Sequence, residues 1–172
     1  MASFDRPFNH IIITEGGYVD HPLDRGGPTK YGITLGAYEG YMQRNVSAAE
    51  IKKLTIEDAR KFYLAVYWRP LRLEEFPDRL ALCLFDQAVN RGAFSAVAAL
   101  QHVIEASADG MVGPETLSKV RALNEDLVLW AFLSEALRSY ARIVQRMPSQ
   151  AVFVQGWTNR VLHLIELTLI RV

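Results

Sequence analysis

Residues 15–34 read EGGYVDHPLDRGGPTKYGIT and differ in amino-acid composition from the sequence on either side of them. Four glycines, two prolines and two aspartates fall within residues 16–28. Glycine and proline favour backbone angles that helices do not use, so this stretch predicts a long loop or a small β-hairpin region. Loops of this length in a compact domain usually carry function. Chemistry is therefore expected here first.

Helical patterns flank this region. Residues 4–14 place their apolar side chains on one helical face. Ser47 begins a capping-box pattern, and Thr55 is a predicted N-cap for a helix that runs from Ile56 to Tyr67 and ends before Pro70. Later helices are predicted over residues 78–91, 94–106, from 114 onward, 124–146, and after 157. The sequence thus predicts an all-α fold with a small glycine-rich loop or β-hairpin region.

Length and charge narrow the class of protein. A chain of 172 residues fits one compact domain or two small modules, and 50% hydrophobic residues can form a real core. The 19 basic and 19 acidic residues cancel. This balance argues against a nucleic-acid binder that works through a broad basic surface. Recognition of an anionic polymer would then be local, within a groove.

Several features are expected to be absent. The single cysteine, Cys83, cannot form an internal disulfide, and its apolar neighbours predict a buried, inert thiol. The N-terminus shows no secretory signal pattern, and residues 161–172 are too short and too charged to span a bilayer. The four histidines have no ligand spacing, so neither a metal nor another cofactor is expected. We expect a monomer that is made in the cytoplasm.

Glu15 is the first catalytic candidate. It stands at the end of an apolar helix, directly before two glycines. A carboxyl held against an apolar helix loses hydration, which favours its protonated form and suits it to protonate the leaving oxygen of a glycosidic bond. On its spacing alone, a glutamate that simply ends a helix on the surface is the favoured interpretation.

Asp20 and Asp24 are candidates for a second carboxylate. In glycoside hydrolysis such a partner activates water or attacks the sugar, and the carboxyl separation distinguishes the two courses: about 6.5–9.5 Å for inversion and about 5–5.5 Å for retention. Aspartate beside proline and glycine also commonly forms turns by bonding to its own backbone. Both interpretations stay open on the spacing alone.

As a whole, residues 15–34 resemble the signature of glycoside hydrolase family 108, a group of bacterial and phage N-acetylmuramidases. The family pattern is E-G-G-Y followed by D-P-x-D-x-G-G-x-T-x-Y-G-I-T, and the main departure here is His21. The resemblance implies that Glu15 is the acid and Asp24 the aspartate of D-x-G-G. A looser similarity to phage lysozymes implies a lysozyme-like helical fold, with Asp24 and Thr29 orienting the attacking water, and favours Asp24 over Asp20.

The resemblance continues along the chain. Residues 63–70 (YLAVYWRP) and 85–92 (FDQAVNRG) are similar to two further family segments. Asp86 and Asn90 are four residues apart and so share one helical face. They are either ordinary solvated residues or a polar cleft wall that binds sugar, and we favour the cleft wall. The expected substrate-binding residues are Tyr18, Asp20, Thr29, Tyr31, Thr34, Asp86 and Asn90.

The last third resembles the peptidoglycan-binding module that often follows this catalytic domain. Residues 109–116 match its turn and residues 153–161 its closing segment. Trp157 either stacks on a sugar or fills the core, and the core is favoured. We therefore expect a catalytic region over residues 1–92 and a helical peptidoglycan-binding region over residues 93–172, packed as one compact unit.

The implied function is hydrolysis of the β-1,4 bond between N-acetylmuramic acid and N-acetylglucosamine, as in an endolysin. The partner is the peptidoglycan glycan strand at the cell wall or periplasm, which a holin or a secretion system would make accessible. Two alternatives remain at this stage. A lytic transglycosylase needs only the one glutamate, and a wall-binding or secretion-assisting protein would need no catalysis.

Overall fold

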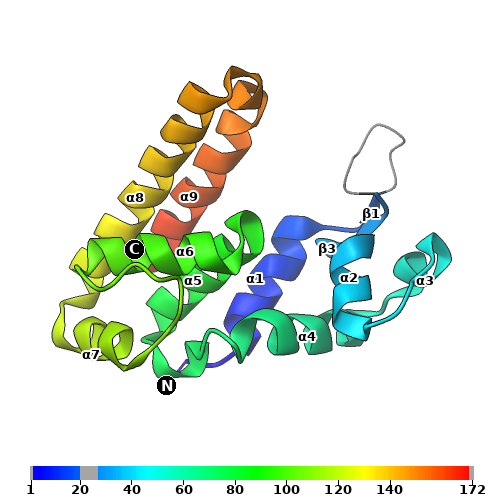
Figure 1. Ribbon diagram of the computed structural model, residues 1–172, viewed down its shortest axis with the longest axis horizontal. Helices are drawn as coiled ribbons and strands as arrows, with labels where there is room; N and C mark the ends of the chain where they lie inside the picture. Colours follow the sequence, from blue (N-terminus) through cyan, green and yellow to red (C-terminus); the bar gives the residue numbers. More distant parts are fainter. Residues whose placement is uncertain (1, 20–26, 171–172) are drawn as a thin grey trace. The chain divides into compact units, whose positions relative to one another are not determined.

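The computed structural model describes residues 2–19 and 27–170 of the chain. Helices dominate these residues (Figure 1), and three two-residue strands follow the first helix in the sequence. This confirms the predicted helical class with a small β element in the glycine-rich region. No helix among the described residues is long and apolar enough to cross a membrane.

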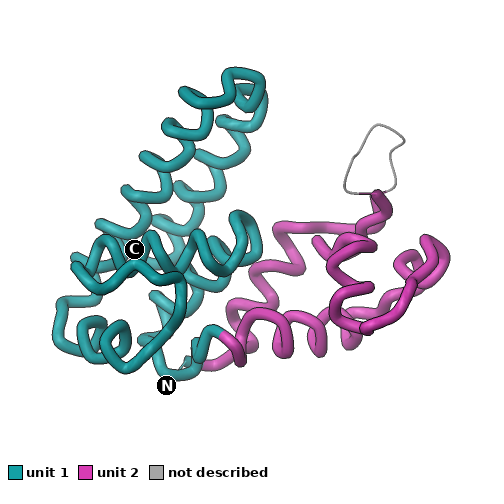
Figure 2. Tube along the Cα trace, in the orientation of Figure 1, with its two compact units in different colours: residues 1–2, 71–172 teal, residues 3–70 magenta. Residues whose placement is uncertain are grey.

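The contacts divide the chain into two units (Figure 2). The first comprises Ser3–Pro70, and the second comprises Met1–Ala2 with Leu71–Val172. This boundary differs from the expected division after residue 92, because the helix over residues 78–91 packs with the later helices. Each unit is described by itself below.

In the first unit, helix α1 (Asp5–Glu15) buries one apolar face. Phe8 and Ile11 of that face are 3% and 0% exposed. The Arg60 guanidinium lies 5.2 Å from the ring centre of Phe4 and 5.3 Å from that of Phe8, and it pairs with Asp5. A cation over two ring faces adds electrostatic attraction to the apolar packing. These contacts fix α1 against the helix that carries Arg60.

The glycine-rich region forms the predicted hairpin. Strands β1 (Tyr18–Val19), β2 (Thr29–Lys30) and β3 (Ile33–Thr34) make an antiparallel sheet in the order β1-β2-β3. The turn between β2 and β3 consists of Tyr31 and Gly32, both with positive φ. A two-residue turn of this kind matches the twist of the strands it joins. The sheet leads directly into helix α2 (Leu35–Met42).

Two capping boxes begin the next helices, where a capping box at Ser47 and an N-cap at Thr55 were predicted. Ser47 caps α3 (Ala48–Lys53) and Thr55 caps α4 (Ile56–Tyr63). In each box the hydroxyl accepts a backbone N–H while a carboxylate three residues on bonds back to the cap. The structure thereby satisfies the first exposed N–H groups of both helices.

The end of α4 differs from the prediction. The α-helix stops at Tyr63, and a π-helical turn, η1 (Leu64–Trp68), follows it. There the Arg69 amide donates to the Leu64 carbonyl, five residues back, at 3.0 Å. Such turns widen the helix by one residue, redirect side chains and are frequent at functional sites.

The second unit is built around α5 (Asp78–Arg91), which packs against α6 (Ala93–Val103) and α8 (Glu125–Arg146). A short 3-10 turn, η2 (Leu73–Glu75), precedes α5, and α7 (Pro114–Ala122) begins with the predicted proline. The chain then turns at η3 (Pro148–Phe153) and returns along α8 as α9 (Val154–Thr168). Helix α9 starts before Trp157 rather than after it, and that ring stacks on Tyr140 at 5.0 Å.

Helix α5 is buried on every side over residues 80–88, which include the predicted buried thiol of Cys83. Asp86 is consequently 0% exposed, and the Arg160 Nε on α9 donates to both of its carboxylate oxygens at 2.9 and 3.0 Å. The prediction that Asp86 lines a sugar-binding cleft therefore needs correction. A carboxylate enclosed on all sides cannot contact a sugar, and its pairing with Arg160 satisfies a buried charge.

Removing the Asp86 charge is expected to destabilise the protein. In Asp86→Asn the Arg160 guanidinium keeps its charge in a nearly enclosed site, so we expect the free energy of unfolding to fall by about 3–5 kcal/mol. Chemical denaturation measures this change. Asp78→Asn, at the exposed start of the same helix, is the control and should cost less than about 1 kcal/mol. Unchanged stability of Asp86→Asn would contradict the structural role.

The capping box of α3 gives stability a pH dependence. A hydrogen bond from Arg44 at 2.7 Å and bonds from Ser47 lower the pKa of Glu50 from 4.5 to about 2. A carboxyl with a depressed pKa in the folded state stabilises the fold above its unfolded pKa. This contribution is lost as the pH falls from about 4.5 through about 2.

We therefore expect the stability gap between the parent and Glu50→Gln to be largest above about pH 5 and to shrink towards pH 2. Acid titration monitored by urea unfolding measures the gap. In an Arg44→Gln background the gap should vary less with pH, because Arg44 is the largest cause of the shift. A gap that grows towards acid pH would refute the assignment.

Candidate functional site

Glu15 is the last residue of α1, and the chain leaves the helix directly after it. Gly16 has a φ of 71°, and its amide still donates to the Ile12 carbonyl at 3.3 Å. A positive φ is easy for glycine and strained for other residues, so Gly16 ends the helix cleanly. This geometry places a half-buried carboxyl at the point where helix α1 meets the hairpin.

The hairpin turn touches the Glu15 side chain. A Cβ built on Gly32 would lie 2.7 Å from the Glu15 Cγ and 2.9 Å from its Cβ. These distances are shorter than van der Waals contact allows, and Gly32 also has a φ of +76°. Only glycine therefore lets the turn pack this closely against the carboxyl-bearing side chain.

Tyr63 and Tyr67, which were not predicted as site residues, also belong to the environment of Glu15 and Gly32. The Tyr63 hydroxyl lies 2.7 Å from the same point above Gly32 and donates to the Tyr31 carbonyl at 2.8 Å. Burial raises the pKa of the Tyr67 phenol, and the negative charge of Glu15 raises it further. The only sequence signal for these roles was their position in residues 63–70, since nothing in the spacing pointed towards Glu15.

The other expected residues of the hairpin lie on or beside the three strands. Thr29 pairs with Thr34 across β2 and β3, and Tyr18 pairs with Lys30 across β1 and β2. The Thr34 hydroxyl caps helix α2 by accepting the Ala37 amide at 3.2 Å. Thr34 thus has a structural role whether or not it meets a sugar.

Tyr18 and Tyr31 each have a lysine ammonium near the ring face. Lys52 lies 5.6 Å from the Tyr18 ring centre, and Lys30 lies 5.2 Å from that of Tyr31. The half-buried rings therefore combine an apolar face with a nearby positive charge. Asp20, His21 and Asp24 lie outside the described residues.

Asn90 belongs to the other unit and takes part in a polar network. Its amide donates to the Tyr140 hydroxyl at 2.9 Å, and that hydroxyl donates to Gln87 at 3.3 Å. Burial is the main cause that raises the pKa of the Tyr140 phenol. Unlike Asp86, Asn90 is only partly buried.

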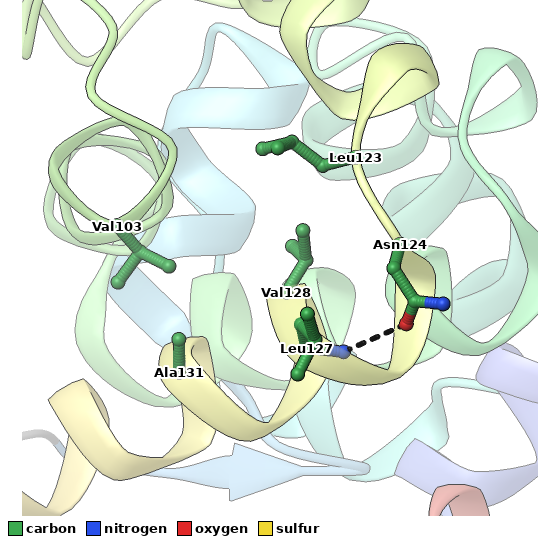
Figure 3. Close-up of a pocket in the computed structure, with 6 residues that line it drawn as sticks. All are labelled: Val103, Leu123, Asn124, Leu127, Val128 and Ala131. Carbon is green, nitrogen blue, oxygen red and sulfur yellow. Dashed lines mark hydrogen bonds between the residues drawn. The ribbon is translucent and has the colours of Figure 1, made fainter.

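Two of the pockets among the described residues are lined neither by Glu15 nor by another candidate residue. Figure 3 shows one, an apolar hollow of about 200 Å³ near the start of α8. Its polar member, Asn124, points its side-chain oxygen at the Leu127 amide and caps the helix (Figure 3). The other, of about 190 Å³, contains the Arg44–Glu50 pair.

The chemistry that this arrangement supports is proton transfer by one carboxyl. Glu15 lies at a helix end beside the Gly32 turn, and its charge acts on the Tyr67 phenol. No group of three or more His, Cys, Asp or Glu side chains among the described residues is placed to hold a metal ion.

Comparison with known proteins gives the family. The family model described as "Glycosyl hydrolase 108" matches residues 8–92, and "Predicted Peptidoglycan domain" matches residues 95–162. The chain is similar to a solved structure of Brucella abortus SagA, with 33% sequence identity and a TM-score of 0.86. The alignment covers 96% of this chain and 93% of that one. A search of curated proteins found no match.

Both matched regions agree with the resemblance carried by residues 15–34 and by the closing segment of the chain. The likeness to the SagA structure extends over nearly the whole length, so it includes both units. The chain therefore belongs to glycosyl hydrolase family 108 and carries a peptidoglycan domain after its glycosyl hydrolase region.

Proposed function

We propose that this glycosyl hydrolase is an N-acetylmuramidase, which cleaves the β-1,4 bond between N-acetylmuramic acid and N-acetylglucosamine in peptidoglycan. Glu15 acts as the general acid and Asp24 orients or activates the attacking water. Tyr18, Thr29, Tyr31 and Asn90 are the proposed sugar contacts, with Asp20 and Thr34 as further candidates. Asp86 is left out because it is buried.

The observation that carries the proposal is the position of Glu15. It lies in the matched family region, at the end of α1, and the turn of the hairpin packs against it. A general acid must be held within hydrogen-bond reach of the leaving oxygen. A side chain fixed between a helix end and a glycine turn meets that requirement better than a mobile surface glutamate.

The substrate follows from the second matched region. A peptidoglycan domain joined to a glycosyl hydrolase keeps the enzyme near its polymer and raises the local concentration of cleavable bonds. The overall balance of charge removes a general attraction to an anionic wall, so this binding has to come from local contacts. No cofactor is proposed, since a proton and a water suffice for the hydrolysis.

The products of digestion test the type of reaction. Hydrolysis adds water across the bond, so digestion of purified Gram-negative sacculi should yield fragments that end in reducing N-acetylmuramic acid. Mass spectrometry after digestion identifies these ends. Anhydro-muramic ends would instead show that the sugar's own hydroxyl attacks, and the enzyme would then be a lytic transglycosylase.

The acid role of Glu15 is tested by Glu15→Gln, which keeps the shape of the side chain and removes its proton-donating carboxyl. General acid catalysis typically contributes about 10²–10⁴-fold, so we expect kcat to fall by that factor with little loss of sacculus binding. Release of soluble muropeptides measures the rate. Glu57→Gln, at an exposed glutamate in the same unit, is the matched control and should retain the parent rate.

If Glu15→Gln cleared sacculi as fast as the parent, Glu15 would not be the acid. If the parent itself bound sacculi without releasing fragments, the chain would be a wall-binding protein rather than a muramidase.

A further inference from the structure

The Glu15 side chain rests on the backbone of the hairpin turn. Its Cγ and Cβ lie 2.7 and 2.9 Å from the place where a Cβ on Gly32 would stand. The carboxyl-bearing carbon is thus in contact with the one residue of the turn that has no side chain. Contact at this range restricts the rotation of the Glu15 side chain, because the backbone behind it does not move aside.

The Tyr63 hydroxyl, at the end of α4, lies close to the same point above Gly32. It lies 2.7 Å from that point above Gly32 and donates to the Tyr31 carbonyl at 2.8 Å. The Tyr63 side chain is 1% exposed, and its ring packs 5.4 Å from Phe62. A hydroxyl at the end of a buried, rigid ring fixes whatever it bonds to more firmly than a surface side chain would.

The bonded residue needs such support. Tyr31 has a φ of 54°, a conformation that is unfavourable for a residue with a Cβ. Backbone held in such a region persists only where the surroundings determine it. The bond from Tyr63 to the Tyr31 carbonyl is one such determinant, and Gly32 follows directly.

The phenol of Tyr67 is a second group in this ring cluster. Tyr67 belongs to the π-helical turn after α4, and its ring centre is 5.9 Å from that of Tyr63. Its titration is affected first by burial and then by the Glu15 charge. Tyr63 and Tyr67 are thus neighbours in the ring cluster, and the Glu15 charge acts on one of them.

We propose that Tyr63 and Gly32 are positioning residues for Glu15: the Tyr63 hydroxyl holds the Tyr31–Gly32 turn, and the turn holds the Glu15 carboxyl in the orientation that donates a proton. This inference rests on the proposed function. A misplacement of about 1 Å at a reacting group can cost about 10²-fold in rate, so a brace of this kind has catalytic value although it does not contact the substrate.

The test uses Tyr63→Phe, which keeps the ring and removes the hydroxyl. On solubilised, uncross-linked glycan strands we expect kcat to fall about tenfold while KM changes less than about twofold, because proton donation is impaired and sugar binding is not. On a dinitrophenyl glycoside of the N-acetylglucosamine–N-acetylmuramic acid disaccharide the loss should be less than about twofold. That leaving group departs as a stable phenolate and needs little help from an acid.

Gly32→Ala is the second variant. A methyl group at this position would overlap the Glu15 side chain and the Tyr63 hydroxyl. We expect the same pattern, with a larger loss on glycan strands than on the aryl glycoside. Circular dichroism and thermal unfolding verify that each variant is folded before its rates are compared.

Two controls separate positioning from general damage. Tyr41 belongs to the same ring cluster, with its ring centre 5.5 Å from that of Phe62. Tyr41→Phe removes a hydroxyl that does not contact the Tyr31–Gly32 turn, and the variant should match the parent on both substrates. Ser47→Ala removes the N-cap of α3 and is expected to lower the thermal unfolding temperature, but it should not change the ratio of the two rates.

An equal loss on both substrates, or no loss on glycan strands, would refute the positioning role of Tyr63. The proposed function fails in a different way. If the parent cleaves strands and Glu15→Gln does not, but Tyr63→Phe equals the parent, the muramidase proposal stands and only the positioning role is wrong. If the parent releases no reducing ends, the muramidase proposal itself is wrong.

Discussion

The close approach of Gly32 to Glu15 is the constraint on which the first unit depends. The turn can pack against the carboxyl-bearing side chain only because Gly32 lacks a Cβ and accepts a positive φ. The residue before it, Tyr31, takes a strained conformation so that the turn can close, and the Tyr63 hydroxyl bonds to its carbonyl. These two contacts join the end of α1, the hairpin and the end of α4. In the proposed function, an acid held in this way would have its orientation set before any substrate arrives, which is how preorganisation lowers a barrier.

In the second unit the main constraint is the burial of polar groups inside a helical bundle. Helix α5 is enclosed over residues 80–88, and Asp86 lies within that enclosed part. Its charge is matched by Arg160 from α9, while Gln87 and Asn90 bond to Tyr140 from α8. These bonds tie three helices together at defined points. Replacing one partner leaves the other buried without its match, which makes such networks sensitive to substitution.

The boundaries of the family models and of the structural units fall at different places. The glycosyl hydrolase model extends to residue 92, whereas the contacts separate the chain after Pro70. Helix α5 accounts for the difference, because it lies within the first model yet packs with α6 and α8. A family model covers the stretch of sequence that relatives share, whereas a structural unit is defined by the residues that contact one another. The two need not coincide where a helix forms the centre of a bundle.

The sequence by itself determined the helical class, the position of the hairpin, the N-caps at Ser47 and Thr55 and the catalytic candidate, because these depend on interactions within a few residues or on a contiguous motif. Glycine pairs, the Ser47 and Thr55 caps and the apolar period are all visible locally. The environment of Asp86 was not visible. Two polar residues four positions apart give the same sequence pattern on a solvated helix face and on a buried one. The partner of Asp86, Arg160, is 74 residues away in the sequence. Tyr63 and Tyr67 were missed for the same reason. Only the tertiary structure brings the end of α4 to the turn that holds Glu15, since the bond from Tyr63 to Tyr31 spans 32 residues and no local pattern specifies which backbone carbonyl a buried hydroxyl will meet.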